Sequence, residues 1–482
     1  MHSYLLSAPV MSDTFYLLFT RIQPIFFWYF LSINFVYIVL LLLGASKIFL
    51  RKKQLALEDF SFLITSNTLP AITFLMPAYN EGKHILAAIH NVLNLTYRYK
   101  EIIVVNDGSS DNSMEVMKQG LDLVEIPLYY QQHLHTQKVR GVYRSRAYPE
   151  VVVVDKDHGK KFDTLNAAIN ACQNAHFVII DADTFIDDTH FETLIRPLLT
   201  DPTTIAIGAS VRLRNGFSLD YNKIASLQKP MKLLPAMQSL EYLRAFLERQ
   251  GWDYIGGNIV LSGAFSIFQK QAVVDVGGYV DTVAEDMEII IRLHRFMKEH
   301  KRPYKISYLP DPVAWTEGPE RLSSLARQRA NWQRGMCDCL WYHRRAFFNP
   351  SYGRFGMFVI PFWLYGEAIE PFIELLGFLT IFIGYYYGAI HIAFVYLFLL
   401  VTLGFTLIFT LFCILIEELS FKKLSSLKTL TYFLFYNFLE NVGYRQLTVF
   451  WRIRGTWNFF RDLKTVRKNS KRIDTLMKKK KG

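Results

Sequence analysis

The sequence predicts an α/β fold with a mainly parallel sheet, flanked by transmembrane helices at the N- and C-terminal ends of the chain. Two patterns predict this arrangement. Between residues 67 and 349, short apolar runs alternate with stretches of helical spacing, which is typical of strands joined by helices. Long apolar runs lie before and after this part, and they carry much of the hydrophobic share, which is 51% of the 482 residues.

The first long apolar run covers residues 25–50 and carries no charge before Lys47. It is long enough to span the hydrocarbon core of a bilayer. It is also too long for a removable signal peptide and lacks a small-residue cleavage site. The basic cluster at residues 51–53 follows directly, and such clusters normally mark the cytoplasmic side of a span. We therefore expect one span here, with the following chain in the cytoplasm.

Four apolar runs in the central part have the length and composition of buried strands. Each ends in polar or acidic residues, and helix-like stretches lie between them at residues 83–93 and 161–175. The four strands are expected at residues 71–79, 101–107, 151–155 and 176–183. Ligands bind at the carboxyl ends of the strands in parallel sheets, so the acidic residues there should converge on one edge.

Asp181 and Asp183 follow the run HFVII, the last of these strands. Two carboxylates two positions apart at a strand end can both reach a divalent cation such as Mg²⁺ or Mn²⁺, and the cation can bridge phosphate oxygens. A solvated acidic loop would have the same spacing. The place of the pair directly after a buried strand favours the metal site.

Two further acidic positions each allow a structural and a chemical interpretation. Asp107 ends a strand and precedes a Gly-Ser-Ser turn, so it either caps the next helix or hydrogen-bonds a nucleobase. The segment 77–81 after the first strand carries the same ambiguity. Asp286 stands at the start of a helix, where an acid is a common cap, and the alternative is a general base.

A helix-like segment at residues 327–335 combines several arginines with Trp332. Arginine side chains suit a diphosphate, and an indole face suits the apolar side of a sugar ring. An interfacial helix with basic residues against lipid headgroups would have a similar sequence. The amphipathic stretch 238–250 also allows two interpretations. It lies either at the membrane surface or over the edge of the sheet.

The C-terminal part contains apolar runs at residues 372–387 and 393–415 and a more polar run at 427–450. The preceding segment, 357–374, carries two prolines and three glutamates, and we expect an interfacial or pore-side helix there. If the basic tail is cytoplasmic, an even number of spans follows the central part, and two is the simplest count. The tail after Lys464 is either attracted to anionic lipid or solvated and disordered.

The net charge of +12 allows nucleic acid, anionic lipid or phosphorylated substrates as partners, and lipid is favoured because the basic clusters flank the apolar runs. The four cysteines form neither a disulfide framework nor a zinc spacing. They indicate a reducing compartment for the central part of the chain.

Seven short motifs occur in an order that resembles the membrane-integrated family 2 glycosyltransferases, a group that includes the synthases of cellulose, chitin, hyaluronan and poly-N-acetylglucosamine. The resemblance covers about residues 69–349 and the flanking spans, and it implies a GT-A-type nucleotide-sugar-binding domain. The motifs are PAYNE (77–81), VNDGSSD (105–111), GKKFDTLNAAIN (159–170), DAD (181–183), SGAFSIF (262–268), AEDMEIIIRL (284–293) and RQRANWQRG (327–335).

The resemblance implies a role for each matched residue. Asp286 would be the catalytic base, and Asp181 and Asp183 would coordinate the metal beneath the diphosphate. Asp107 would bind the uracil. All the residues that would bind the donor and the acceptor end are Ala78, Tyr79, Glu81, Asp107, Lys161, Gln328, Arg329 and Trp332.

Two positions depart from the family pattern. Ala284 replaces the threonine of a Thr-Glu-Asp motif, which is a mild change because the aspartate is kept. Asn331 replaces the arginine before Trp332, so one charge-assisted pair to the diphosphate would be missing, worth about 1.5–3 kcal/mol. Arg329 or Arg334 would have to compensate, or the donor affinity would be lower.

The sequence is therefore interpreted as a membrane-bound inverting hexosyltransferase. It would transfer a sugar from a UDP-sugar, of the UDP-glucose or UDP-N-acetylglucosamine class, to a growing polysaccharide of the cell envelope and take part in its export. A single transfer to a lipid-linked acceptor and a catalytically degenerate scaffold are the alternatives. The expected cofactor is Mg²⁺ or Mn²⁺, membrane lipid is an expected partner, a small membrane accessory subunit is left open, and nucleic acid is not expected.

The expected location is the cell (inner or plasma) membrane, with several spans and a cytoplasmic catalytic domain. Four parts follow along the chain. They are residues 1–53 with one transmembrane helix, 54–350 with the catalytic domain, 351–460 with interfacial and transmembrane helices, and 461–482 with the basic tail.

Overall fold

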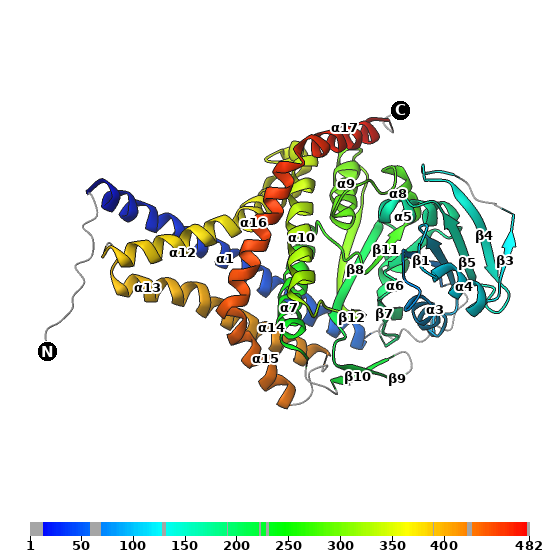
Figure 1. Cartoon of the computed structure of the whole chain (residues 1–482), viewed down its shortest axis with the longest axis horizontal. Helices are drawn as coiled ribbons and strands as arrows, with labels where there is room; N and C mark the ends of the chain where they lie inside the picture. Colours follow the sequence, from blue (N-terminus) through cyan, green and yellow to red (C-terminus); the bar gives the residue numbers. More distant parts are fainter. Residues whose placement is uncertain are drawn as a thin grey trace.

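The computed structural model describes residues 13–57, 69–127, 132–189, 191–220, 223–227, 231–388, 390–421 and 427–479. A ten-stranded sheet with its helices occupies one end of the molecule, and the long apolar helices extend from the other end (Figure 1). The predicted α/β fold with apolar helices before and after it is thus confirmed. The final residues of the basic tail, 480–482, lie outside the described residues.

The centre of the sheet is parallel, as the sequence predicts. Strand β1 pairs with β2 and β6, and β2 pairs with β5, in each case parallel. The side chains of these strands are buried on both faces, which explains their near-continuous apolar runs. The four strands are β1 Ile72–Ala78, β2 Lys100–Asn106, β5 Val151–Lys156 and β6 His176–Ile180.

Strands on both sides extend this parallel centre, mostly in antiparallel pairs. The strand order is β3-β4-β5-β2-β1-β6-β11-β8-β12-β7, and among the described strands β8 and β12 form the one further parallel pair. The outer strands are β3 Leu123–Ile126, β4 Val139–Ser145, β7 Phe185–Ile186, β8 Thr204–Leu213, β11 Phe265–Gln269 and β12 Lys305–Thr316. A separate hairpin consists of β9 Phe217–Asp220 and β10 Lys223–Leu227.

Helices connect the strands, and two of them match the predicted helical stretches at 83–93 and 161–175. Helix α5 packs on β1 and β2 and brings its first turn to the carboxyl ends of these strands. Helix α9 begins directly after the Ala284 cap, so Asp286 lies in its first turn as expected. The helices are α3 Ile85–Leu93, α4 Ser113–Gly120, α5 Lys160–Ala171, α6 Phe191–Thr200, α8 Lys270–Asp275 and α9 Glu285–Glu299.

Helix α7, Leu233–Tyr254, lies between the sheet and the apolar helices. It contacts β8 and β12 as well as α1 and α14, so the stretch predicted at 238–250 covers the sheet and contacts the apolar helices. Phe246 of α7 stacks on Tyr308 of β12 with ring centroids 6.1 Å apart. Helix α10, Leu322–Tyr342, carries the arginine and tryptophan motif and packs against α16.

Two helices are long and apolar enough to cross a membrane, at Arg21–Leu55 and Ile392–Phe421. A third span results if the bent pair Phe355–Ala368 and Glu370–Tyr386, with a bend of 41°, counts as one. The predicted interfacial segment at 357–374 covers this bend. These elements are α1 Asp13–Leu57, η3 Phe355–Val359, α11 Ile360–Phe362, η4 Trp363–Ala368, α12 Glu370–Tyr386, α13 Ile392–Leu399, η5 Leu400–Gly404 and α14 Phe405–Phe421.

The more polar run predicted at 427–450 is a broken helix. Its break lies at η6, where Gly443 has a φ of +89°. Helix α17 then crosses the top of the sheet domain in Figure 1, beside α9 and α8. The remaining elements are η1 Arg344–Ala346, η2 Pro350–Tyr352, α15 Leu427–Leu439, η6 Glu440–Tyr444, α16 Arg445–Arg461 and α17 Leu463–Lys479.

Buried ion pairs join the sheet domain to the apolar helices. Arg212 of β8 binds Glu417 of α14 through two bonds, Nε to Oε1 at 3.0 Å and Nη2 to Oε2 at 2.7 Å. Arg51 of α1 lies 2.8 Å from the carboxylate of Asp311 in β12. Part of the basic cluster predicted to face lipid therefore binds protein. Lys52 and Lys53 are exposed, although Lys52 also donates a bond of 3.0 Å to the carbonyl of Leu419.

Candidate active site

Asp181 and Asp183 follow β6 at the edge of the sheet where β1 and β2 also end. The side chain of Asp183 is exposed. Partial desolvation by the surrounding protein and the negative charge of Asp181 nevertheless raise the pKa of the Asp183 carboxyl. No group of three or more His, Cys, Asp or Glu side chains among the described residues could hold a metal ion. A pair of carboxylates nevertheless fits Mg²⁺ or Mn²⁺, because such ions complete their shell with substrate phosphates and water.

Lys161 connects this pair to helix α9. Its Nζ lies 2.8 Å from Oδ1 of Asp181 and 3.2 Å from Oε1 of Glu285. Burial opposes the charge of this ammonium group, but the carboxylates of Asp181 and Glu285 outweigh burial and raise the pKa of Lys161. A protonated lysine is therefore fixed between the predicted metal ligands and the predicted base.

Asp286 lies beside this lysine, in the first turn of α9. Burial and the neighbouring carboxylate of Glu285 raise the pKa of Asp286 to about 6, although Lys161 opposes them. Its Oδ1 accepts a hydrogen bond of 2.8 Å from the backbone N–H of Met287. A side chain on Gly263 would meet Lys161 Nζ at 3.5 Å and Asp286 Oδ2 at 3.6 Å, so the glycine keeps the space between these groups open.

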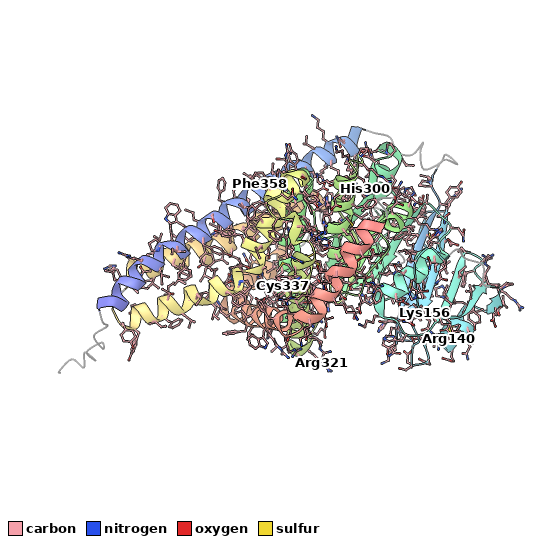
Figure 2. The ribbon with its side chains drawn as sticks, turned by 90° about the horizontal axis from the view of Figure 1, so that it is seen from above. Arg140, Lys156, His300, Arg321, Cys337 and Phe358 are labelled. Carbon is pink, nitrogen blue, oxygen red and sulfur yellow. The ribbon has the colours of Figure 1, made fainter. Side chains whose placement is uncertain are left out.

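Asp107, expected to bind a nucleobase, is buried and surrounded by donors from the protein. Its Oδ1 accepts bonds from Lys156 Nζ at 2.5 Å and from Gly159 N at 2.9 Å. Its Oδ2 accepts a bond of 3.0 Å from Lys160 N and lies 2.9 Å from Nδ1 of His158. Three N–H donors and the imidazole nitrogen thus surround both oxygens of this carboxylate. In this structure Asp107 therefore shapes the loop before α5, at the end of the molecule away from the apolar helices where Figure 2 labels Lys156.

Tyr79 and His158 form an open aromatic pair next to this loop. Their ring centroids lie 4.6 Å apart, and about half of each side chain is exposed, 47% and 51% respectively. Sequence reasoning named Tyr79 but missed His158, because the histidine is not part of a matched motif. The signal that could have indicated His158 was Asp107, the buried aspartate whose carboxylate lies 2.9 Å from its ring.

The other two residues of the PAYNE motif lie beside these groups. Ala78 is buried at the end of β1, and its carbonyl accepts a bond of 2.9 Å from the N–H of Asp107. Burial and the negative charge of Asp183 raise the pKa of Glu81. The PAYNE motif therefore contributes Tyr79 to the aromatic pair and a carboxylate that senses the charge of the predicted metal ligands.

The motif on α10 is only partly open to a ligand. Trp332 is 48% exposed, and its ring lies 6.4 Å from that of Tyr242. Arg329 is buried, forms an ion pair with Glu241 of α7, and stacks 4.4 Å from the Trp332 ring. The Oε1 atom of Gln328 is buried and lacks a hydrogen-bond partner within the described part of the chain.

The two arginines expected to compensate for Asn331 are both engaged elsewhere. Arg329 binds Glu241, and Arg334 lies 2.9 Å from the carboxylate of Asp462. Asn331 itself is exposed. Both guanidinium groups are therefore paired with carboxylates here, and their compensation for Asn331 stays a prediction.

A second group of charges lies between α10 and the apolar helices. Arg452 donates to Glu370 at 2.6 Å and to Oε1 of Gln333 at 3.0 Å. Arg445 donates to Glu374 at 2.7 Å. Through Arg452 and Gln333 these polar side chains connect the middle of α10 with the segment that the sequence predicts to be interfacial or pore-side.

The sequence from residue 70 to 335 matches the family described as Glycosyltransferase like family 2. A poly-beta-1,6-N-acetyl-D-glucosamine synthase of Staphylococcus aureus (strain COL) is 29% identical over 302 residues, which is 62% of either chain. A synthase of the same name from Staphylococcus epidermidis is 28% identical over 267 residues, or 55% of this chain and 54% of the relative. The chain thus matches less than two thirds of the length of these curated relatives.

A mannosyltransferase from Pyrobaculum calidifontis, solved with GDP-Man and Mn²⁺, superposes with a TM-score of 0.49 and 16% identity, over 85% of this chain and 99% of that one. The family match covers more than half of the present chain and every motif singled out in the sequence. On that match the chain belongs to the family 2 glycosyltransferases.

Proposed function

We propose that this enzyme is an inverting hexosyltransferase that extends a polysaccharide from a UDP-sugar donor of the N-acetylglucosamine class. The observation that carries the proposal is the contact of Lys161 with Asp181 on one side and Glu285, the neighbour of Asp286, on the other. This contact supports the proposal that Asp286, the neighbour of Glu285, acts as a base close to the groups that would hold a diphosphate. The donor class is supported by the poly-N-acetylglucosamine synthases among the relatives.

In the proposed reaction Asp286 removes the proton from an acceptor hydroxyl, and that oxygen attacks the anomeric carbon of the donor. The bond from this carbon to the diphosphate breaks as the new glycosidic bond forms on the opposite face, so the configuration inverts. An aspartate with a pKa of about 6 remains ionised at neutral pH and is a stronger base than an ordinary aspartate. No covalent intermediate with the protein is needed.

The leaving diphosphate would be stabilised from two sides. Asp181 and Asp183 would hold a divalent cation, which neutralises negative charge on the phosphate oxygens. Lys161 supplies a fixed positive charge between this pair and α9. Lys161 also keeps Asp181 paired before the donor arrives.

Recognition of the rest of the donor is assigned to the open aromatic groups. Tyr79 and His158 expose ring faces on which a uracil could stack, and Asp107 holds the histidine in place. Trp332 with Tyr242 offers an aromatic wall for a sugar ring. Gln328 keeps an acceptor oxygen that lacks a partner within the described residues, which suits a donor from a ligand.

The growing glycan is proposed to leave through the polar contacts between α10 and the apolar helices. Gln333 of α10 shares Arg452 with Glu370, so polar side chains continue from α10 into the helical part. This proposal includes a catalytic domain on the cytoplasmic side of a cell membrane and the division at residues 53, 350 and 460. Membrane lipid is the partner that the apolar helices support.

The decisive experiment measures product size with the purified full chain and labelled UDP-sugars. A long glycan formed with UDP-N-acetylglucosamine, and at most weakly with UDP-glucose, is the expected result. A discrete lipid-soluble product carrying one sugar would replace the polymer by a lipid-linked acceptor. If no donor in the panel were turned over with Mg²⁺ or Mn²⁺ present, the enzyme would be a catalytically degenerate family member.

A further inference from the structure

A cavity of about 590 Å³ lies at the far end of α9 from Asp286. Its walls come from the last residues of α9, from η2 with the residues just before it, and from α17. This volume lies within the range of small-molecule sites in proteins. The cavity shares no lining residue with the active site, which contacts the first turn of the same helix.

Cationic side chains dominate this cavity. Four lining side chains carry positive charge, Arg295, Lys298, Lys301 and Arg345, whereas the acids there are Glu299 and Asp474. Neither of the two lysines forms an ion pair with a side chain in the described part of the chain. Burial, with no compensating carboxylate, lowers the pKa of Lys298. The cavity therefore has a net positive charge that an anion would neutralise.

Arg295 is the buried element of this cavity, with a side chain that is 3% exposed. One of its Nη atoms lies 3.0 Å from Nδ1 of His343, and the other is 3.3 Å from Glu299. Its Nε atom has no hydrogen-bond partner among the described residues. The nearest further acid, Asp474, is 3.9 Å away, so its pairing with this guanidinium is weak.

We propose that this cavity binds a phosphate-bearing anion, presented by a lipid headgroup or by a soluble phosphate ester, at a site separate from the active site. Guanidinium and ammonium groups are the usual ligands of phosphate oxygens. A lipid source is feasible because Phe348, next to the lining residue Asn349, is 67% exposed, and Phe358 a few residues further is 68% exposed.

A chain of buried polar contacts leads from this cavity toward the active site. His343, which accepts from Arg295, presents its Nε2 atom 3.4 Å from Oε1 of Glu288. Glu288 binds Arg292 through two bonds of 2.9 and 2.7 Å. Arg292 in turn donates to the carbonyl of Gly278 at 2.6 Å, in the loop that leads to Asp286. An anion bound at Arg295 would therefore stabilise the arrangement of α9 and this loop.

The test uses the full chain in phosphatidylcholine nanodiscs and inorganic phosphate as the probe, with hydrogen–deuterium exchange as the readout. Phosphate is expected to slow exchange about tenfold in the cavity segments 295–301 and 344–352, relative to chloride at equal ionic strength. A second arm replaces part of the lipid by phosphatidylglycerol without added phosphate. Protection in that arm identifies a lipid headgroup as the source, and protection by phosphate alone identifies a soluble ligand.

The variant that tests the site is Lys298→Gln with Arg345→Gln, which removes two cavity charges. Its matched control is Lys118→Gln with Arg146→Gln, which makes the same charge change on an exposed surface elsewhere. The cavity variant should lose the protection and the control should keep it. If the cavity variant does not fold, Arg345→Gln alone serves, because this side chain is 59% exposed.

Two outcomes would overturn the proposal. One is equal protection of the wild-type chain and the cavity variant. The other is a wild-type chain whose cavity segments are not protected, either because protection is absent in both the phosphate and the phosphatidylglycerol arms or because it is confined to residues near 181–183, in the active site.

Discussion

The charges at the sheet edge differ in kind from those that join the sheet to the apolar helices. At the edge, Lys161 bridges two carboxylates, and the further acids Asp183 and Asp286 have raised pKa values. At the junction, Arg212 meets Glu417 in a two-bond pair that is buried on both sides. The edge thus has more negative than positive charge, whereas the junction is balanced.

This difference indicates which charges serve chemistry and which serve architecture. An excess of carboxylates costs free energy until a cation, a proton or a substrate compensates it, and such sites are typical of function. A balanced buried pair contributes little net stability, but removing one partner is costly because the other charge remains buried. Substitutions at the edge should therefore change turnover, and substitutions at the junction should change folding.

The largest effect is expected from Asp286→Asn, which keeps the size of the side chain and removes the base. Turnover should fall by about 10²–10⁴-fold, while UDP binding and the unfolding midpoint stay nearly unchanged. Initial rates with saturating donor and equilibrium UDP binding give the measurement. Asp281→Asn is the matched control, since Asp281 pairs with Lys160 at 2.9 Å outside the site. Unchanged turnover in the Asp286 variant would remove this residue as the base.

At the junction, Arg212→Met should lower the free energy of unfolding by about 3–5 kcal/mol, because Glu417 is then left buried without its partner. The second variant, Arg212→Met with Glu417→Leu, should recover most of this loss. The matched control is Arg214→Met, whose partner Glu317 is 58% exposed, with an expected loss of about 0–1 kcal/mol. Chemical unfolding in detergent measures all three, and equal losses for the two single variants would contradict the distinction.

The sequence predicted the centre of the fold well because its physical signals are local. The four central strands are apolar on both faces, and each ends at polar residues near the predicted positions. Strand β12 had no comparable signal, since prolines 310 and 312 interrupt its apolar pattern. Pairing with β8 fixes the register of β12, and a pairing between distant segments cannot be predicted from the residues of one segment alone.

The candidate site was predicted in its residue types but not in their partners. Asp181, Asp183 and Asp286 are brought together as the motifs indicated, with Lys161 between them. The direction of a long side chain depends on what packs opposite, however, and Arg329 turns to Glu241 of a helix 88 positions away in sequence. The same reason explains why the role of His158 was missed, because it depends on the carboxylate of Asp107, in the loop after β2.

The pH dependence of turnover should show an acidic limb with an apparent pKa of about 6. Asp286 must be ionised to accept a proton, and its raised pKa means that it becomes protonated below about pH 6 rather than near pH 4. The rate should then fall about tenfold for each further pH unit. Glu285→Gln removes the negative neighbour and should move this limb to lower pH. A limb near pH 4, or one that the Glu285 substitution leaves in place, would contradict the assignment.

His158→Ala should raise the donor KM by about five- to tenfold and change kcat less, because stacking on one ring contributes about 1–3 kcal/mol. The variant removes one wall of the Tyr79 pair without touching the acids of the edge. His158→Phe keeps a ring and should recover most of the affinity. His90→Ala is the control, since this ring packs on Tyr148, 5.4 Å away, outside the site. Equal donor KM values for the two alanine variants would exclude His158 from donor binding.

The smallest effect is expected from Asn331→Arg, which adds a cation beside Trp332. Both neighbouring arginines belong to the balanced kind of charge, since Arg329 pairs with Glu241 and Arg334 with Asp462. A new guanidinium at this exposed position would have no such partner and would be available to the diphosphate. Because the pair would form in solvent, we expect a gain of about 0–1 kcal/mol, or up to about fivefold in donor KM.

Asn331→Gln, which adds length without charge, is the control for this substitution. Titration of the donor at low and high salt separates the two, since the gain of the arginine variant should shrink as ionic strength rises. If the arginine leaves the KM unchanged while Arg329→Gln raises it, then Arg329 exchanges its partner Glu241 for the donor during the reaction. In that case a balanced pair on α10, between Arg329 and Glu241, would also serve chemistry. The distinction between the sheet edge and the balanced pairs would then not hold for this helix.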